Sequence, residues 1–147
     1  MKTLIKSSVL IFLVALLSAC KSGMVISHGS SFGHCRGFCN KELKLTEKGT
    51  KYSYWENGNA PVTNTLEVTN QGIDFKKAAV LLNAETFKKL ELRYGCPDCA
   101  DGGSEWIEVK DGLNTKRIVF EYGNPPEELK ALNDQLRSIQ AFYDKTK

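Results

Sequence analysis

The stretch NPPEELKALNDQLRSIQAFY, from Asn124 to Tyr143, contains the most regular apolar pattern in the chain. Its large apolar residues recur at the spacing of one helical face: Leu129, Leu132, Leu136, Ile139 and Tyr143. This period predicts an amphipathic helix over about 126–143. Asn124 is the expected N-cap, and Pro125 and Pro126 suit a first turn, where backbone donors have no partner within the helix. A helix with one apolar face needs a surface to cover.

Segments elsewhere in the chain, in which apolar and polar residues alternate, are expected to form that surface. Apolar and polar side chains alternate over 41–47, 50–56, 62–69, 104–110 and 115–122, with Gly- or Asn-bearing turns between several of these segments. Alternation is typical of strands with one buried face. The spacing of Phe75, Ala78, Ala79 and Leu82 places them on one face of a second helix over about 74–83. The predicted fold class is α+β, an antiparallel sheet of four to five strands with two helices packed on one face.

The amino end has the composition of an export signal. Lys2 and Lys6 precede an apolar run over 9–17, which ends in the residues Leu17-Ser18-Ala19-Cys20. A basic head, a short apolar middle and a small-residue cleavage site are typical of a secretory signal peptide. The nine-residue run is too short for an ordinary membrane span.

Leu17-Ser18-Ala19-Cys20 also resembles the lipobox of bacterial lipoproteins. The resemblance implies that residues 1–19 are removed, and that Cys20 becomes the lipidated first residue and the membrane anchor. Two or more acyl chains anchor a protein stably. Lys21 stands where Asp would retain an enterobacterial lipoprotein in the inner membrane, so the resemblance implies the outer membrane, facing the periplasm.

The remaining chain divides into a linker and one domain. The Gly- and Ser-rich segment 20–33 predicts a flexible lipidated tether, and 34–147 predicts a single globular domain of ordinary size. Loss of Lys2 and Lys6 lowers the formal charge from +3 to +1, so no electrostatic reason for nucleic-acid binding remains.

The order of motifs is similar to that of a family of small uncharacterised bacterial lipoprotein domains, whose opening reads Cys-x-Gly-x-Cys-Pro. The matching residues span about 35–140: Cys35, Gly37, Cys39, Phe87, Leu90, Tyr94, Gly112, Lys116, Tyr122, Pro126 and Leu129. Asn40 stands in place of the family's Pro, and Cys96-Pro97-Asp98-Cys99 is an addition. The resemblance implies an architecture but assigns no activity and no catalytic residue.

Four cysteines remain after Cys20, namely Cys35, Cys39, Cys96 and Cys99. In an exported domain they most often form two disulfides, and the close spacing slightly favours local pairing over crossed pairing. A four-cysteine zinc site is the alternative, with His34 as a further ligand. A redox-active Cys-x-x-Cys motif at residues 96–99 is a second alternative, although Asp98 and Asp101 would raise the pKa of its thiols.

Few other residues suggest chemistry. His28 and His34 lie in or beside the predicted tether, where we expect them in water, and Glu105 is expected to face water as well. Trp55 and Trp106 alternate against apolar neighbours, so we expect them on the sheet face away from the helices. There they form a possible partner-binding pair, unless the rings cover each other or a loop.

The sequence therefore predicts a membrane-anchored envelope lipoprotein that is not an enzyme, a binding or structural module with an envelope protein as its possible partner. No cofactor or metal is expected beyond the covalent lipid on Cys20. The alternative is a thiol-dependent periplasmic protein, with either the redox or the zinc site.

Overall fold

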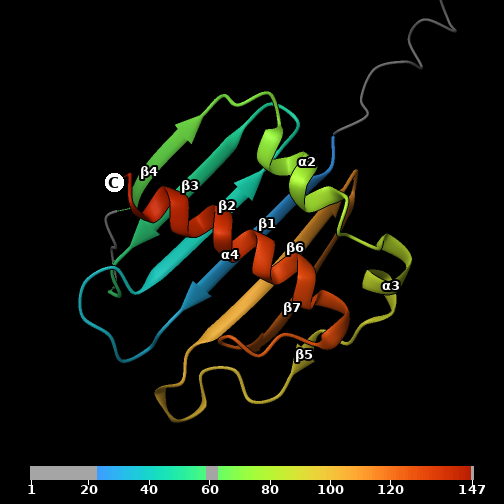
Figure 1. The fold of residues 1–147 in the computed structure, drawn as a ribbon. Helices are drawn as coiled ribbons and strands as arrows, with labels where there is room; N and C mark the ends of the chain where they lie inside the picture. Colours follow the sequence, from blue (N-terminus) through green and yellow to red (C-terminus); the bar gives the residue numbers. More distant parts are fainter. Residues whose placement is uncertain (1–22, 59–62, 147) are drawn as a thin grey trace, which may run out of the picture.

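The computed structural model describes residues 23–58 and 63–146. They contain a seven-stranded sheet in the order β4-β3-β2-β1-β6-β7-β5 (Figure 1). The strands are β1 (Val25–Ser31), β2 (Asn40–Leu45), β3 (Thr50–Trp55), β4 (Thr63–Val68), β5 (Arg93–Tyr94), β6 (Ser104–Asp111) and β7 (Asn114–Glu121). All neighbours are antiparallel except β5 and β7, which pair in parallel. The α+β class is confirmed, but the sheet is larger than predicted and mixed.

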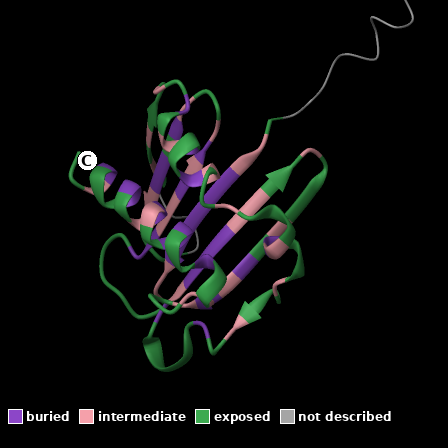
Figure 2. Ribbon diagram, turned by 45° about the vertical axis from the view of Figure 1, so that its right-hand side comes forward, coloured by how far each residue is buried: buried purple, intermediate pink, exposed green. Residues whose placement is uncertain are grey.

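Helices α2 (Ile73–Ala79), α3 (Ala84–Lys89) and α4 (Lys130–Asp144) complete the described fold. Helix α4 crosses the strands, and α2 lies beside it on the same face (Figure 1). Buried residues run along the central strands, whereas the hairpin ends and the outer sides of the helices are exposed (Figure 2). The core between helices and sheet includes Ile26, Leu43, Tyr52, Phe75, Ile107, Phe120, Leu132, Leu136, Ile139 and Tyr143.

The chain enters the sheet earlier than predicted. Val25–Ser31 is the central strand β1, hydrogen-bonded to β2 on one side and to β6 on the other, so the tether prediction is wrong for these residues. At Gly29 the absence of a side chain serves close packing and not flexibility. A Cβ at Gly29 would lie 2.1 Å from Cζ2 of Trp106, which is its cross-strand partner. The rest of the predicted signal and tether, up to residue 22, lies outside the described residues.

The two predicted hairpins form as β2–β3 and β6–β7, because alternating side chains and short turns agree in both. The predicted helix 74–83 is shorter. It ends at Ala79, and Asn83 then starts α3 by accepting a hydrogen bond from the Thr86 amide at 3.0 Å. An Asn side chain that caps a new helix competes with continuation of the old one.

The carboxy-terminal helix begins later than predicted. Glu127–Leu129 forms a 3-10 turn, and α4 continues from Lys130 to Asp144. Asn124 does not cap it: its side chain donates to Glu121 at 3.3 Å, in the turn after β7. The predicted apolar stripe is confirmed, since all five of its residues are buried.

Candidate functional site

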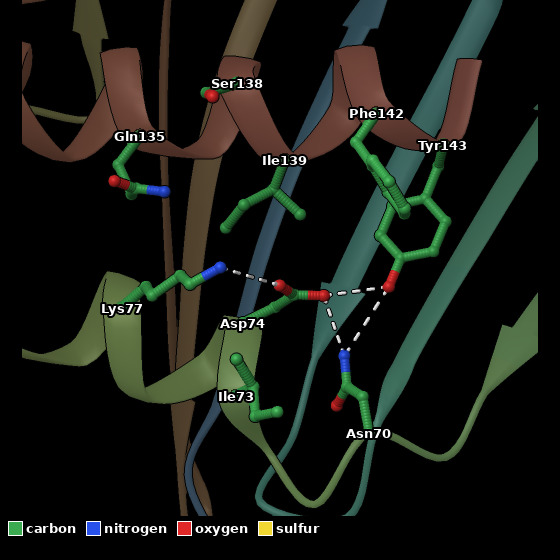
Figure 3. Close-up of a pocket in the computed structure, with 9 residues that line it drawn as sticks. All are labelled: Asn70, Ile73, Asp74, Lys77, Gln135, Ser138, Ile139, Phe142 and Tyr143. Atoms are coloured by element: carbon green, nitrogen blue, oxygen red, sulfur yellow. Dashed lines mark hydrogen bonds and ion pairs between the residues drawn. The ribbon is translucent and has the colours of Figure 1, made fainter. Parts of the chain in front are cut away.

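A pocket of about 360 Å³ lies between α2 and the second half of α4 (Figure 3). Its lining comes from the residues before and within α2 and from one side of α4: Asn70, Ile73, Asp74, Lys77, Gln135, Ser138, Ile139, Phe142 and Tyr143. We call this cavity the α2–α4 pocket. Helix α2 has seven residues and α4 has fifteen, so α2 lies along only part of α4.

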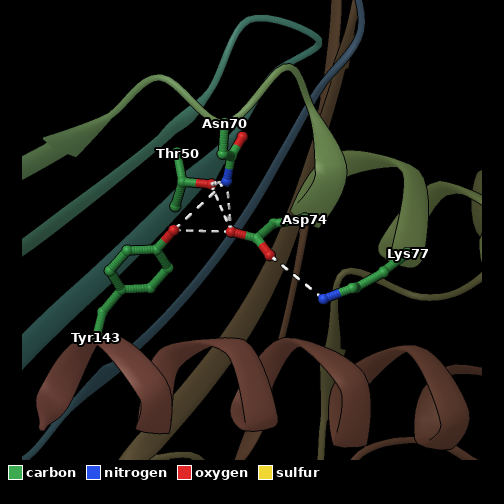
Figure 4. Close-up of polar contacts among 5 residues, drawn as sticks. All are labelled: Thr50, Asn70, Asp74, Lys77 and Tyr143. Carbon is green, nitrogen blue, oxygen red and sulfur yellow. Dashed lines mark hydrogen bonds and ion pairs between the residues drawn. The ribbon is translucent and has the colours of Figure 1, made fainter.

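A hydrogen-bond cluster around Asp74 forms the floor of the α2–α4 pocket (Figure 4). Oδ2 of Asp74 accepts hydrogen bonds from Thr50 Oγ1 at 2.9 Å, from Asn70 Nδ2 at 2.7 Å and from the Tyr143 hydroxyl at 2.8 Å. Asn70 Nδ2 also donates to Thr50 Oγ1 at 2.9 Å. The cluster joins β3, the loop after β4, α2 and α4, and it therefore fixes the shape of the pocket.

The second oxygen of Asp74 faces a different environment. Its nearest cation is the Lys77 ammonium, 3.9 Å from Oδ1 across one helical turn. Burial and the neighbouring Asp74 carboxylate raise the pKa of Tyr143, so its hydroxyl stays protonated and remains a donor. Oδ1 and Lys77 are thus the charged groups that a ligand could contact.

The rim of the α2–α4 pocket is apolar. Ile73 is 54% exposed and Phe142 is 62% exposed, high values for large apolar side chains. Ser138 supplies a hydroxyl to the lining, and it forms no hydrogen bond to a histidine or a carboxylate in the part of the chain described. A small set of polar groups inside an apolar rim suits binding, because it gives orientation together with apolar contact.

A second Tyr–Asp pair lies close to the first. The Tyr52 hydroxyl donates to Asp144 Oδ1 at 2.5 Å, and Lys41 binds the other oxygen of Asp144 at 2.7 Å. Burial and the Asp144 hydrogen bond raise the pKa of Tyr52 strongly. These contacts hold the last turn of α4 on the sheet, so the tyrosines stabilise the end of α4 rather than provide reactive groups.

The four cysteines form two local disulfides, Cys35–Cys39 and Cys96–Cys99, with Cα atoms 5.6 Å and 5.4 Å apart. This is the pairing that the sequence slightly favours. Among residues 23–58 and 63–146, no three side chains of His, Cys, Asp or Glu are grouped so that they could hold a metal ion.

The two disulfide loops pack against each other at one end of the sheet. Asp98 accepts a hydrogen bond from the Gly33 amide at 3.4 Å, and His34 pairs with Asp101 at 2.5 Å. Asp98 and Asp101 also have left-handed backbone conformations, with φ of 64° and 60°. His34 is exposed as predicted, but beside a carboxylate.

His28 is buried, contrary to prediction, and so is Glu105. Nε2 of His28 lies 2.7 Å from Glu105 Oε1, and Nδ1 lies 3.0 Å from Gln140 Oε1. Burial alone would raise the pKa of Glu105, but the His28 hydrogen bond and charge, the Gly123 amide and Arg137 together hold it below its usual value. Sequence reasoning missed this cluster because the partners come from β1, β6 and α4, and each polar residue looks solvated when read alone.

The two tryptophans do not form a pair. Trp106 lies on the sheet face away from the helices, as predicted, but it is only 9% exposed, because its ring covers Gly29 and the Arg117 guanidinium lies 5.1 Å from its centroid. Trp55 is half-buried on β3, and strands β2 and β1 separate it from Trp106. A joint aromatic surface is therefore not available.

No protein-family model matches the chain, and no match is found among the curated proteins compared.

No helix within the described residues is long and apolar enough to span a bilayer. The α2–α4 pocket and the disulfide loops are thus the features from which a function can be argued.

Proposed function

We propose that the protein is a lipid-anchored lipoprotein of the bacterial envelope, and that it binds a partner rather than catalysing a reaction. The lipobox residues Leu17-Ser18-Ala19-Cys20 support the anchor, with Cys20 carrying the lipid. Lys21 after Cys20 supports the outer membrane, facing the periplasm. The two disulfides support an oxidising compartment, because such bonds persist outside the cytosol.

The α2–α4 pocket is the single observation that carries the binding role. Its strongest acceptor, Oδ2 of Asp74, is already occupied by three donors from the protein itself. Its tyrosine stays protonated, as the raised pKa of Tyr143 requires. Groups committed to holding a shape position a ligand well but transfer protons poorly. The exposed side chains of Phe142 and Ile73 offer apolar surface of the kind that partner proteins commonly bury.

Site-specific photo-crosslinking in cells tests the proposal. A photoreactive residue is placed at Phe142 on the pocket rim, or at Leu92, which is 63% exposed in the segment after α3 and does not line the pocket. We expect a discrete adduct from position 142 and none from position 92. The rim substitutions Ile73→Ser and Lys77→Glu should remove the adduct without unfolding the protein, since both side chains are exposed. Equal labelling at both positions would contradict binding at this pocket.

A further inference from the structure

Several turns of the chain lie at the end of the sheet where β1 begins. Val25 pairs with Lys110 of β6, and Ile26 pairs with Leu45 of β2. The β2–β3 turn (46–49) and the β6–β7 turn (112–113) therefore lie at this end, and α2 starts there too (Figure 1). The disulfide loops lie at the opposite end. We call the end at which β1 begins the proximal end.

Apolar side chains project into solvent at the proximal end. Leu113, at the tip of the β6–β7 turn, is 102% exposed, and Val80, just after α2, is 79% exposed. Leu81 and Val68 are also exposed. Leu82 shares a small pocket with Met24 and Asp111, which places the segment after α2 against the first described residues. Covering these side chains with another apolar phase would gain free energy in proportion to the apolar area removed from water.

Lysines accompany these apolar residues. Lys48 in the β2–β3 turn, Lys110 beside the β6–β7 turn and Lys76 on α2 are exposed, and none forms an ion pair with another described residue. Glu47 and Asp111 are the acidic neighbours at the two turns. Long lysine side chains can extend their ammonium groups toward headgroup phosphates while their methylene stems lie on apolar surface.

The position of Cys20 decides what covers this end. Only Lys21 and Ser22 separate Cys20 from Gly23, and three fully extended residue-to-residue steps reach at most about 11 Å. An acylated Cys20 sits at the boundary between headgroups and acyl chains. The proximal end is consequently held within one short peptide length of the bilayer. The bilayer is therefore the apolar phase that the anchor keeps next to the exposed side chains of this end.

We propose that the proximal end lies directly on the bilayer, with Leu113 and Val80 inserted at the level of the acyl boundary and with Lys48 and Lys110 at the headgroups. This inference rests on the proposed lipidation of Cys20. The domain then stands with β1 leading away from the membrane. A seven-residue strand is about 23 Å long, so the disulfide loops face the periplasmic space well above the headgroups.

Fluorescence quenching in vesicles tests the orientation. The lipidated full chain is purified from cells and reconstituted into vesicles of phosphatidylethanolamine and phosphatidylglycerol that contain brominated acyl chains. Leu113→Trp reports on the proximal end, and because Trp55 and Trp106 also fluoresce, the quenching of the wild-type chain is measured and subtracted from that of each reporter. Phe38→Trp is the matched control, because Phe38 is 43% exposed in the disulfide loop at the opposite end. We expect bromine to quench L113W about twofold more than F38W, since an inserted side chain lies about 5–10 Å into the interface.

The outcomes separate this inference from the proposed function. Mass spectrometry of the same preparation shows whether Cys20 carries lipid. An unmodified Cys20 overturns both proposals. A lipidated Cys20 with equal quenching of the two reporters overturns the bilayer contact alone, and it leaves the anchor intact. A blue shift of L113W emission that rises with protein concentration in detergent, without vesicles, would instead assign the proximal end to contact between copies and would also overturn the inference.

Discussion

The Tyr143 hydroxyl, near the end of α4, donates a hydrogen bond of 2.8 Å to Asp74 Oδ2 in the first turn of α2. The two residues are 69 positions apart in the sequence, and their contact fixes the distance between the helices that enclose the α2–α4 pocket. Because Tyr143 is buried, this hydrogen bond is shielded from competition with water.

Removal of the Tyr143 hydroxyl should weaken the fold measurably. Tyr143→Phe keeps the ring and deletes one donor to a carboxylate, so we expect a loss of about 1.5 kcal/mol in the free energy of unfolding. Lys77→Ala is the control. Its ammonium lies 3.9 Å from the other oxygen and is exposed, so its loss should cost less than about 0.5 kcal/mol. Urea denaturation at neutral pH measures both losses in the free energy of unfolding. Equal losses would contradict the prediction, because the buried hydrogen bond would then stabilise the fold no more than the exposed ion pair does.

The buried pair of His28 and Glu105 should make stability depend on pH. Because the folded protein lowers the pKa of Glu105, its contribution is present above the unfolded pKa of about 4.3 and is lost as the pH falls through the folded value. Glu105→Gln removes the charge of the acceptor that His28 and the Gly123 amide contact, and it should cost about 2 kcal/mol at pH 7.

The difference between wild type and E105Q should therefore shrink as the pH falls below about 4. Denaturant midpoints measured across this range provide the test. A constant difference down to pH 3 would show that Glu105 titrates alike in the folded and unfolded chain, which contradicts the lowered pKa.

Each disulfide should stabilise the domain modestly. Bridges that close loops as short as Cys35–Cys39 and Cys96–Cys99 are expected to contribute about 2 kcal/mol each. Replacement of either pair by Ser should lower stability by that amount. Because the two disulfide loops contact each other, we expect the loss in the double replacement to differ from the sum of the two. Protein taken from the periplasm and unfolded in the presence of maleimide should show no free thiol at these four positions. A reactive pair at 96 and 99 would favour a redox role instead.

Gly29 should not tolerate a side chain. The Cβ of Gly29→Ala would lie 2.1 Å from the indole of Trp106 and 2.7 Å from the Lys41 carbonyl oxygen, so strand or ring must move. We expect a loss of about 1–3 kcal/mol. Gly23→Ala is the matched control, because its Cβ would meet nothing within 4 Å. Thermal unfolding that is unchanged in G29A would contradict the close packing of Trp106 on β1.

The sequence predicts those elements whose patterns are local. The hairpins and the α4 stripe are confirmed because their residues are periodic and adjacent in the chain. Strand β1 is missed because Gly29 and its serine neighbours resemble a linker, and only the cross-strand partner Trp106 reveals that position 29 has no room for a side chain. Composition cannot distinguish a segment that packs closely from one that is flexible.

The candidate site is hidden from the sequence for the same reason. Asp74 reads as an ordinary first-turn acid and Tyr143 as one more apolar residue of a helix face. Their pairing depends on how α2 and α4 cross, and no local pattern encodes that angle. The disulfide pairing could be favoured beforehand, because cysteines three and four residues apart can bond without help from the rest of the fold.

The most direct test of the central proposal is the chemical state of residue 20 in protein recovered from cell membranes. Intact-mass analysis should find a chain that begins at Cys20 and carries a diacylglyceryl group with a further acyl chain, and Cys20→Ser should release the domain into the soluble fraction. A chain that keeps residues 1–19, or one whose Cys20 thiol is free while the protein still sediments with membranes, would contradict the account.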